Sequence, residues 1–235
     1  MKDNFLRGIY IEWDELDKDS YARRIPALSK LSRLDFDKSV TLFSGENGSG
    51  KSTLLEAIAC EYGFNAEGGT LNFNFSTYDD ISDLGDAIVI VKGTERAKSG
   101  YFLRAESFFN MATKAVEYGC DYGSLHEQSH GESFLSYFNY FSGRGLYLLD
   151  EPEAALSPQN QLVLFSKIIK MVKEGSQFII ATHSPILLGL PNAQIYNFSR
   201  DGVCQTEYEK TDSYTITKNF LGNREMFIKE LSDEI

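Results

Sequence analysis

Eight consecutive residues have the types and spacing that hold a phosphate chain. Residues 45–52 read Gly-Glu-Asn-Gly-Ser-Gly-Lys-Ser and match the P-loop pattern G-x-x-x-x-G-K-[ST]. Glycines let backbone N–H groups turn toward a β-phosphate, and the N-terminus of a following helix adds partial positive charge. Lys51 would reach the β- and γ-phosphates, and the Ser52 hydroxyl would bind Mg²⁺. The residues expected to contact a nucleotide are Gly45, Asn47, Gly48, Ser49, Gly50, Lys51, Ser52 and Thr53.

Two adjacent carboxylates, Asp150 and Glu151, follow the apolar run at residues 146–149. A buried strand that delivers an acidic residue beside a P-loop is the arrangement that holds Mg²⁺ in P-loop NTPases. We expect Asp150 to support the hydrated ion, and Glu151 to orient and deprotonate the attacking water. The plainer interpretation is an exposed acidic turn after a strand.

A histidine, His183, comes just after a second apolar run at residues 178–181. Parallel strands direct their carboxyl ends toward one ligand crevice. An imidazole in that crevice can donate a hydrogen bond to a γ-phosphate oxygen, so we expect His183 to serve hydrolysis. The alternative is a histidine with a structural role.

Two elements must frame the P-loop. Residues 40–44 are a short apolar run that predicts a buried strand before it. After it, Leu54, Leu55 and Ile58 have helical spacing. A strand, a glycine-rich turn and a helix form the context in which this pattern binds phosphate.

The runs at residues 146–149 and 178–181 are apolar throughout, which is typical of strands covered on both faces of a sheet. Between them, Ser157 can cap a helix, Pro158 fits its first turn and Gly175 can end it. Strand, helix and strand at this spacing predict a βαβ unit. The stripe expected to face the sheet consists of Leu162, Phe165, Ile169 and Val172.

The other segments complete an α/β fold with a mostly parallel sheet, an antiparallel β portion from the N-terminal strands and a small helical lobe. Residues 194–208 predict a hairpin around Asp201-Gly202. Strands are expected at 6–13, as an edge strand, and at 87–91, a loop at 63–74, and helices at 107–118, over Phe134, Tyr137, Phe138 and Phe141, and after Thr211.

Composition narrows the function classes. The 235 residues suit one large domain, and 23 basic against 34 acidic side chains give a net charge of −11. That charge argues against binding nucleic acid over the whole surface. The cysteines Cys60, Cys120 and Cys204 lie far apart and form no CxxC pair. No apolar run is long enough to cross a bilayer and residues 1–4 open no signal peptide, so we expect a cytoplasmic protein without a transmembrane segment.

The order of the motifs resembles that of ABC-type ATPases over nearly the whole chain. Asp150-Glu151-Pro152 resembles their Walker B end, residues 154–157 their D-loop and His183 their switch histidine. Residues 129–133, Ser-His-Gly-Glu-Ser, stand where the signature sits but depart from Leu-Ser-Gly-Gly-Gln. The wording Glu-Pro-Glu-Ala-Ala-Leu-Ser-Pro is closer to RecF- and SMC-like ATPases than to transporters. Residues 102–109, 125–134 and 177–187 resemble small stand-alone bacterial ATPases of that group.

The resemblance implies one ABC-type domain over residues 1–235, with a helical lobe at roughly 95–141 that bears the signature. It implies ATP and Mg²⁺ as ligands and an ATP-driven head-to-tail homodimer. In that dimer Ser129, Gly131 and Glu132 would contact the nucleotide held by the other copy. The segment could instead be a helix cap.

Two parts of the family site have no clear counterpart. No glutamine occurs between Lys51 and Gln128, so Arg104 or Glu106 stands in the region of the glutamine loop, unless either is a surface ion pair. An adenine contact could come from Arg7 or Tyr10, although a core or surface role suits both.

The resemblance favours a soluble RecF/SMC-like ATPase that serves DNA maintenance, defence or a regulatory complex through DNA or an effector protein. The alternative is the nucleotide-binding subunit of a membrane transporter, and a third is a scaffold that binds ATP without hydrolysing it. The nearest approach to a basic cluster is formed by Arg23, Arg24, Lys30 and Arg33, which suits a solvated face better than a DNA site.

Overall fold

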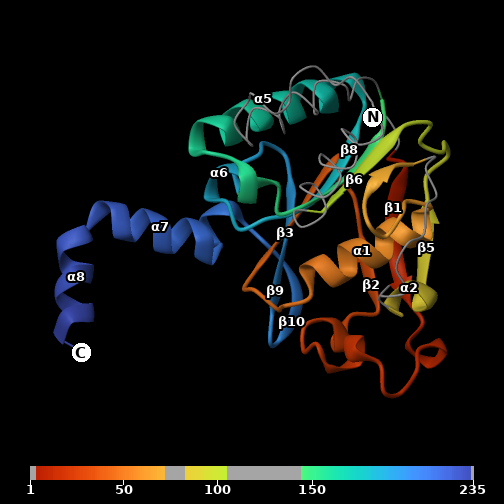
Figure 1. Cartoon of the computed structure of the whole chain (residues 1–235), viewed down its shortest axis with the longest axis horizontal. Coiled ribbons are helices and arrows are strands. Elements are labelled where there is room, and N and C mark those ends of the chain that lie inside the picture. Colours follow the sequence, from red (N-terminus) through yellow and green to blue (C-terminus); the bar gives the residue numbers. More distant parts are fainter. Residues whose placement is uncertain (1–3, 72–82, 105–143, 234–235) are drawn as a thin grey trace, which may run out of the picture.

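The computed structural model describes residues 4–71, 83–104 and 144–233, which form two sheets with helices around them (Figure 1). The strands of the larger sheet are β3 (Val40–Gly45), β4 (Gly69–Thr70), β6 (Gly100–Arg104), β7 (Leu146–Asp150), β8 (Gln177–Ala181), β9 (Gln194–Ser199) and β10 (Gly202–Thr206). Their order across the sheet is β10-β9-β3-β8-β7-β6-β4. The mixed α/β architecture expected from the sequence is confirmed.

The five middle strands, from β9 to β6, run parallel, whereas β10 and β4 are antiparallel to their neighbours. All residues of β8, and all but the last of β3 and β7, are buried, as strands covered on both faces require. The hairpin of β9 and β10 is confirmed. The expectation of an uninterrupted loop at residues 63–74 is wrong, because Gly69 and Thr70 pair with β6.

The smaller sheet contains β1 (Leu6–Ile11), β2 (Arg33–Asp35) and β5 (Ile88–Lys92), all antiparallel. The prediction that residues 6–13 form an edge strand is wrong, because β1 lies between β2 and β5. A buried glutamine joins the two sheets: Gln177 of β8 accepts a hydrogen bond from Leu6 N at 2.9 Å and donates one to Leu6 O at 2.7 Å. The antiparallel portion is thereby fixed against the parallel sheet.

The helices are α1 (Lys51–Tyr62), α2 (Leu84–Ala87), α5 (Pro158–Glu174), α6 (Pro185–Leu188), α7 (Asp212–Gly222) and α8 (Arg224–Asp233). Short 3-10 turns are η1 (Trp13–Glu15), η2 (Tyr21–Arg24), η3 (Leu28–Lys30), η5 (Pro152–Ala155) and η6 (Tyr208–Lys210). Ser157 caps α5 by accepting from Asn160 N, Pro158 is its first residue and Gly175 ends it in the left-handed conformation, as predicted. The βαβ unit β7–α5–β8 is confirmed.

Two hydrophobic cores cover the two faces of the larger sheet. One joins α1 to the smaller sheet, and the other lies under α5 and α6. The stripe predicted for α5 is shifted, because its fully buried residues are Leu164, Ile168 and Met171, while Leu162 is 56% exposed. Phe165, Ile169 and Val172 pack at the margin of that core.

The start predicted for the helical lobe, at roughly residue 95, comes before a strand of the central sheet. Residues 100–104 form β6 of the central sheet, and residues 105–141 lie outside the described part. The helices expected at 107–118 and around Phe134–Phe141 also lie outside it. Within residues 4–71, 83–104 and 144–233, none of the helices combines the length and apolar character that crossing a membrane requires.

The helices after Thr211 form a C-terminal arm, residues 212–233, that extends away from the body (Figure 1). No residue of α7 is buried. The rings of Phe220 and Phe227 meet at the bend between the two helices, 5.9 Å apart and edge to face. The arm therefore has local order without a covering layer.

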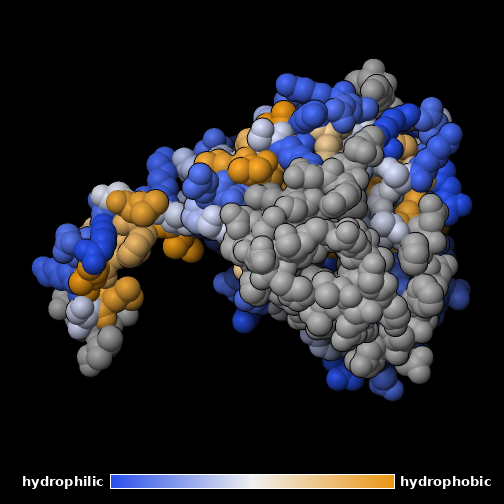
Figure 2. Space-filling model, turned by 45° about the horizontal axis from the view of Figure 1, so that its top comes forward, coloured by the Kyte–Doolittle hydropathy of each residue, from blue (hydrophilic) through white to orange (hydrophobic). Residues whose placement is uncertain are grey.

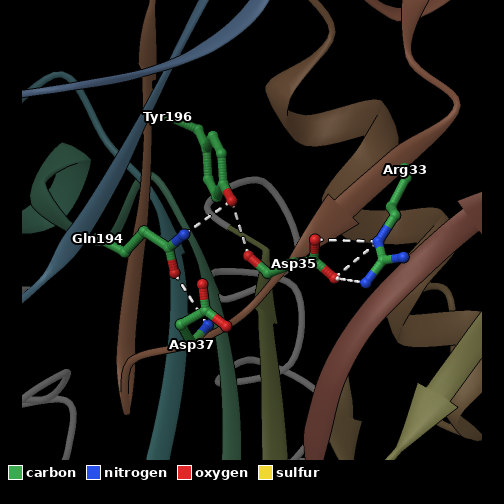
Figure 3. A network of polar contacts seen from close by, with 5 residues as sticks. All are labelled: Arg33, Asp35, Asp37, Gln194 and Tyr196. Carbon is green, nitrogen blue, oxygen red and sulfur yellow. Dashed lines mark hydrogen bonds and ion pairs between the residues drawn. The ribbon is translucent and has the colours of Figure 1, made fainter.

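The edge of the larger sheet where its parallel strands begin, here called the amino edge, carries a closed polar network (Figure 3). The Tyr196 hydroxyl donates to Asp35 O at 2.7 Å and accepts from Gln194 Nε2 at 2.8 Å, while Gln194 Oε1 accepts from Asp37 N at 3.0 Å. The Arg33 guanidinium forms a bidentate contact with the Asp35 carboxylate. The network joins the turn after β2 to β9.

Candidate nucleotide site

The P-loop connects β3 to α1, and its glycines adopt conformations that other residues rarely take. Gly45 has φ +141°, and a Cβ there would lie 2.4 Å from Phe198 O. Gly50, the N-cap of α1, has φ +97°, and a Cβ there would lie 2.8 Å from the Ile25 side chain. The chain can therefore make this turn, with α1 beginning at Lys51, only with glycine at both positions.

The cradle itself is shaped for an anion. The buried Lys51 ammonium donates to Gly45 O and Glu46 O, both at 2.8 Å, so it is held over the loop. Burial lowers the pKa of Lys51, and the carboxylates of Glu151, Asp150 and Glu153 oppose that shift. The Ser49 hydroxyl is buried without a hydrogen-bond partner among the described residues. An orphaned donor beside a positive helix end fits a bound phosphate.

Ser52, in the first turn of α1, meets the predicted metal carboxylate. Its hydroxyl donates to Asp150 Oδ1 at 2.9 Å, across 98 residues of sequence. Burial raises the pKa of Asp150 to about 6, although the Ser52 hydrogen bond acts in the opposite direction. A hydroxyl and a carboxylate oxygen are ligands that Mg²⁺ accepts, so this pair fits the ion.

The strand order explains why Glu151 and His183 meet. Strand β8 lies between β3 and β7, and its last residue, Ala181, pairs with both Phe43 and Asp150. The loop after β8 therefore emerges between the P-loop and Glu151. His183 Nε2 lies 3.5 Å from Glu151 Oε1. Glu151 itself has φ 45° and ψ 51°, an uncommon conformation for a residue other than glycine, which is found most often at functional sites.

Glu153 is a residue of the site that the motifs did not identify. Its Oε1 accepts hydrogen bonds from His183 N at 2.5 Å and Ser184 N at 3.1 Å. Its Oε2 is buried and has no hydrogen-bond partner among the described residues. The carboxylate thus joins the loop after β7 to the loop after β8. The only sequence signal was a second glutamate two residues after Glu151, and nothing in it indicated the partner.

A hollow of about 130 Å³ opens beside the P-loop. Its lining includes P-loop residues, Glu151, Ile25 and the 66% exposed Tyr21. The two adenine candidates lie elsewhere. Arg7 lines a separate hollow of about 900 Å³ at the amino edge, and Tyr10 stacks with Arg33, whose guanidinium lies 5.0 Å from the ring. Tyr21, which the sequence did not single out, is the aromatic residue at the phosphate cradle.

Arg104 ends β6 beside Asp150, as the register of β6 and β7 requires. It forms an ion pair with Glu56 of α1 at 3.2 Å and donates to Ala66 O at 3.1 Å. Arg104 therefore lies at the carboxyl edge in an ion pair, and the choice between Arg104 and Glu106 as the counterpart of the glutamine loop stays open. Glu106 lies outside the described residues, as do Ser129, Gly131 and Glu132.

The basic cluster is committed to local structure. Arg23 donates to Trp13 O, Leu16 O and Asp17 O, and Lys30 donates to Arg200 O and Asp201 O. Arg24 donates to Asp19 O, and Arg33 pairs with Asp35. These contacts fit the interpretation of a solvated face.

Comparison with known proteins agrees with this geometry. The family model of an AAA domain matches residues 25–102, which include the P-loop, and that of an AAA ATPase domain matches residues 132–188, which include Asp150, Glu151 and His183. The chain therefore matches AAA-type ATPase models in two separate segments, each shorter than half of its length. Each match takes in one of the two halves that strand order brings together at the carboxyl edge.

One curated relative of the chain is the L-arabinose transport ATP-binding protein AraG of Geobacillus stearothermophilus. The two sequences are 24% identical over 201 residues, which cover 72% of this chain. The chain spans only 38% of that relative's length. Similar solved structures include the SMC head domain from Thermotoga maritima (15% identity, TM-score 0.48, 86% of this chain and 99% of that one). Another is an ATP-binding cassette of an ABC transporter (18% identity, TM-score 0.46, 94% and 96%).

Proposed function

We propose that this chain binds Mg-ATP at the P-loop and hydrolyses it with Glu151 as general base. The observation that carries the proposal is the meeting of Ser52 with Asp150 and of Glu151 with His183 at one edge of the sheet. The P-loop N–H groups and Lys51 would hold the β- and γ-phosphates, with Ser52 and Asp150 holding Mg²⁺. The ion would neutralise phosphate charge that develops during transfer.

Glu151 and His183 would act on the γ-phosphate side. Glu151 accepts a proton from the attacking water, and His183 donates a hydrogen bond to a γ-phosphate oxygen. Their 3.5 Å separation places the two groups close enough to act on the same water and γ-phosphate. Glu151 combines a left-handed backbone with a place in the lining of the P-loop hollow, as a residue that acts on the nucleotide would.

We further propose an ATP-driven head-to-tail homodimer in which Ser129, Gly131 and Glu132 of one copy close over the nucleotide of the other. Support comes from the hollow at the P-loop. Its volume of about 130 Å³ is smaller than the ~300 Å³ at which complete ligand pockets begin. A site that is completed only by a second surface has this character.

The role we favour is that of a soluble RecF/SMC-like ATPase serving DNA maintenance, defence or a regulatory complex. Its support is the Glu-Pro-Glu wording at residues 151–153. The second candidate is the nucleotide-binding subunit of a transporter, supported by the match to a transport ATP-binding protein. Stimulation of hydrolysis by duplex DNA would favour the first role, and recovery of the chain with a membrane fraction the second.

The test of hydrolysis uses Glu151→Gln with Glu61→Gln as the matched control, since Glu61 is an exposed glutamate on α1. We expect Glu151→Gln to keep its affinity for Mg-ATP, to lose about 10²- to 10⁴-fold in turnover and to increase the fraction of dimer when Mg-ATP is present. Glu61→Gln should match the parent. Unchanged turnover in Glu151→Gln would remove Glu151 from the mechanism.

Binding is tested separately with Lys51→Ala. Loss of charge-assisted contacts to two phosphates should weaken Mg-ATP binding about 100-fold by calorimetry. An unchanged affinity would show that the P-loop is not the nucleotide site.

A further inference from the structure

The C-terminal arm exposes an apolar surface that its own body does not cover. Its large exposed side chains are Ile216 (62%), Phe220 (42%), Leu221 (74%), Met226 (49%), Ile228 (40%) and Leu231 (60%). Figure 2 shows these hydrophobic residues gathered along the extended arm. Helices of 11 and 10 residues are marginal in water without tertiary packing. Beyond its root, the arm therefore leaves these side chains without a packing partner within residues 4–71, 83–104 and 144–233.

The charges of the arm indicate which class of partner suits it. Residues 212–233 contain four acidic and three basic side chains, Asp212, Glu225, Glu230 and Asp233 against Lys218, Arg224 and Lys229. Helices that lie on membranes carry a polar face rich in lysine and arginine, and nucleic-acid contacts need an excess of cations. Nearly balanced charges beside exposed apolar side chains suit a protein partner, and a net charge of −1 per arm places only weak repulsion between two identical arms.

The position of the arm narrows the choice further. The Tyr208 hydroxyl donates to Pro185 O at 2.8 Å, and the Tyr208 ring lies 4.6 Å from the ring of Tyr214 in α7. The root of the arm is thus fixed to α6, which begins two residues after His183. Figure 1 shows the arm leaving the body on the side where the loop from β3 to α1 lies. The arm therefore starts on the side of the body that carries the nucleotide site.

We infer that the arm is a self-association surface that packs against a second copy of this chain without any nucleotide. Six large side chains at these exposures present on the order of 600 Å² of apolar surface per arm, so two arms reach the ~1,200 Å² at which specific interfaces begin. The contact would keep two half-sites near each other at high effective concentration after hydrolysis, a consequence that rests on the proposed head-to-tail pair.

The test compares Leu221→Asp with Asn219→Asp, two changes that add one negative charge to exposed positions of α7. Sedimentation of the full chain without nucleotide should give a dimer at about 10 µM for the parent and for Asn219→Asp. Leu221→Asp should pair at least about 10-fold more weakly. Mg-ATP affinity, measured on the same samples, should stay unchanged and shows that the body is folded.

Three results would overturn the inference. They are a parent that stays monomeric without nucleotide at about 100 µM, a Leu221→Asp variant that pairs as tightly as the parent, and a monomeric parent that binds phosphatidylcholine–phosphatidylserine vesicles through the arm. Hydrolysis does not enter these measurements. If the arm pairs but Lys51→Ala keeps its Mg-ATP affinity, the proposed function fails and the inference stands. If the arm does not pair but Lys51→Ala loses its Mg-ATP affinity, the inference fails and the proposed function stands.

Discussion

The two edges of the larger sheet use polar residues in opposite ways. At the amino edge, Gln194, Tyr196 and Asp35 form a network in which each buried polar group has a partner (Figure 3). At the carboxyl edge, Ser49 Oγ, Glu153 Oε2 and His183 Nε2 are buried and have no hydrogen-bond partner among the described residues. Buried polar atoms that stay unpaired cost stability, so they are retained where a ligand completes them.

The volume of a hollow does not show which edge of the sheet is functional. The amino edge has the larger hollow, about 900 Å³ against about 130 Å³ at the P-loop. Yet the smaller hollow is lined by the strained Glu151, the glycine turn and Ser52, whose hydroxyl donates to the perturbed Asp150. Near the amino edge, Thr41 Oγ1 is also buried without a hydrogen-bond partner among the described residues, so an unpaired atom alone does not mark a site. The edge that combines unpaired atoms with a strained carboxylate is the one where chemistry is expected.

The first way to break this comparison is to change Glu153. Replacing Glu153 with alanine removes the acceptor for His183 N and Ser184 N, so the loop that carries His183 should lose its alignment with Glu151. We expect turnover to fall about 10- to 100-fold while the KM for ATP changes less than about twofold. Glu153→Gln should restore much of the rate, because its amide oxygen can accept the same two hydrogen bonds.

Glu61→Ala is the control for a lost exposed glutamate, and it should leave both parameters unchanged. If Glu153→Ala instead raises KM without lowering kcat, Glu153 acts on ATP binding and not on the alignment of His183.

The sequence predicted the carboxyl edge well because its signals are local. The P-loop pattern fixes its own turn, and the rule that parallel strands share a ligand edge brings Asp150, Glu151 and His183 together. Glu153 could not be predicted, because its role depends on the meeting of two loops 30 residues apart. The motif gave the residue type but not its partner.

The errors have equally specific causes. Helix α5 carries adjacent apolar pairs, so two stripes one position apart fit the same periodicity, and only packing on β8 selects Leu164, Ile168 and Met171. The mixture of apolar and polar positions at residues 6–13 predicts an edge strand, and nothing in it indicates the neighbour β5, about 80 residues away in the chain. Periodicity says which face of an element is buried and nothing about which strand lies beside it.

A second prediction uses the charge of Asp150 to sharpen the contrast. The pKa of Asp150 is raised by burial to about 6, above its value of about 3.9 in an unfolded chain. Below about pH 4 the carboxyl is neutral in both states and costs nothing. The destabilisation caused by the buried charge grows between pH 4 and 6 and reaches its full size above pH 6.

The free energy of unfolding of Asp150→Asn, measured in urea at about pH 8 without Mg²⁺ or nucleotide, should therefore exceed that of the parent by about 2–3 kcal/mol. The gain should vanish near pH 4, and hydrolysis should be lost. A gain that is equal at both pH values would show that the charge of Asp150 is not the cause. Such a site trades stability for a charge that its ligand uses.

The smallest effect belongs to the amino edge. Tyr196→Phe removes a hydroxyl that accepts from Gln194 and donates to Asp35 O. The amide of the buried Gln194 and the carbonyl of Asp35 would each lose that hydrogen bond. We expect a loss of about 1–2 kcal/mol in urea unfolding and no change in Mg-ATP affinity or turnover. Tyr10→Phe is the matched control, since Tyr10 is exposed, and it should be neutral in both assays. A Tyr196→Phe variant that unfolds like the parent but turns over ATP more slowly would assign the amino edge a part in function and remove the distinction between the two edges.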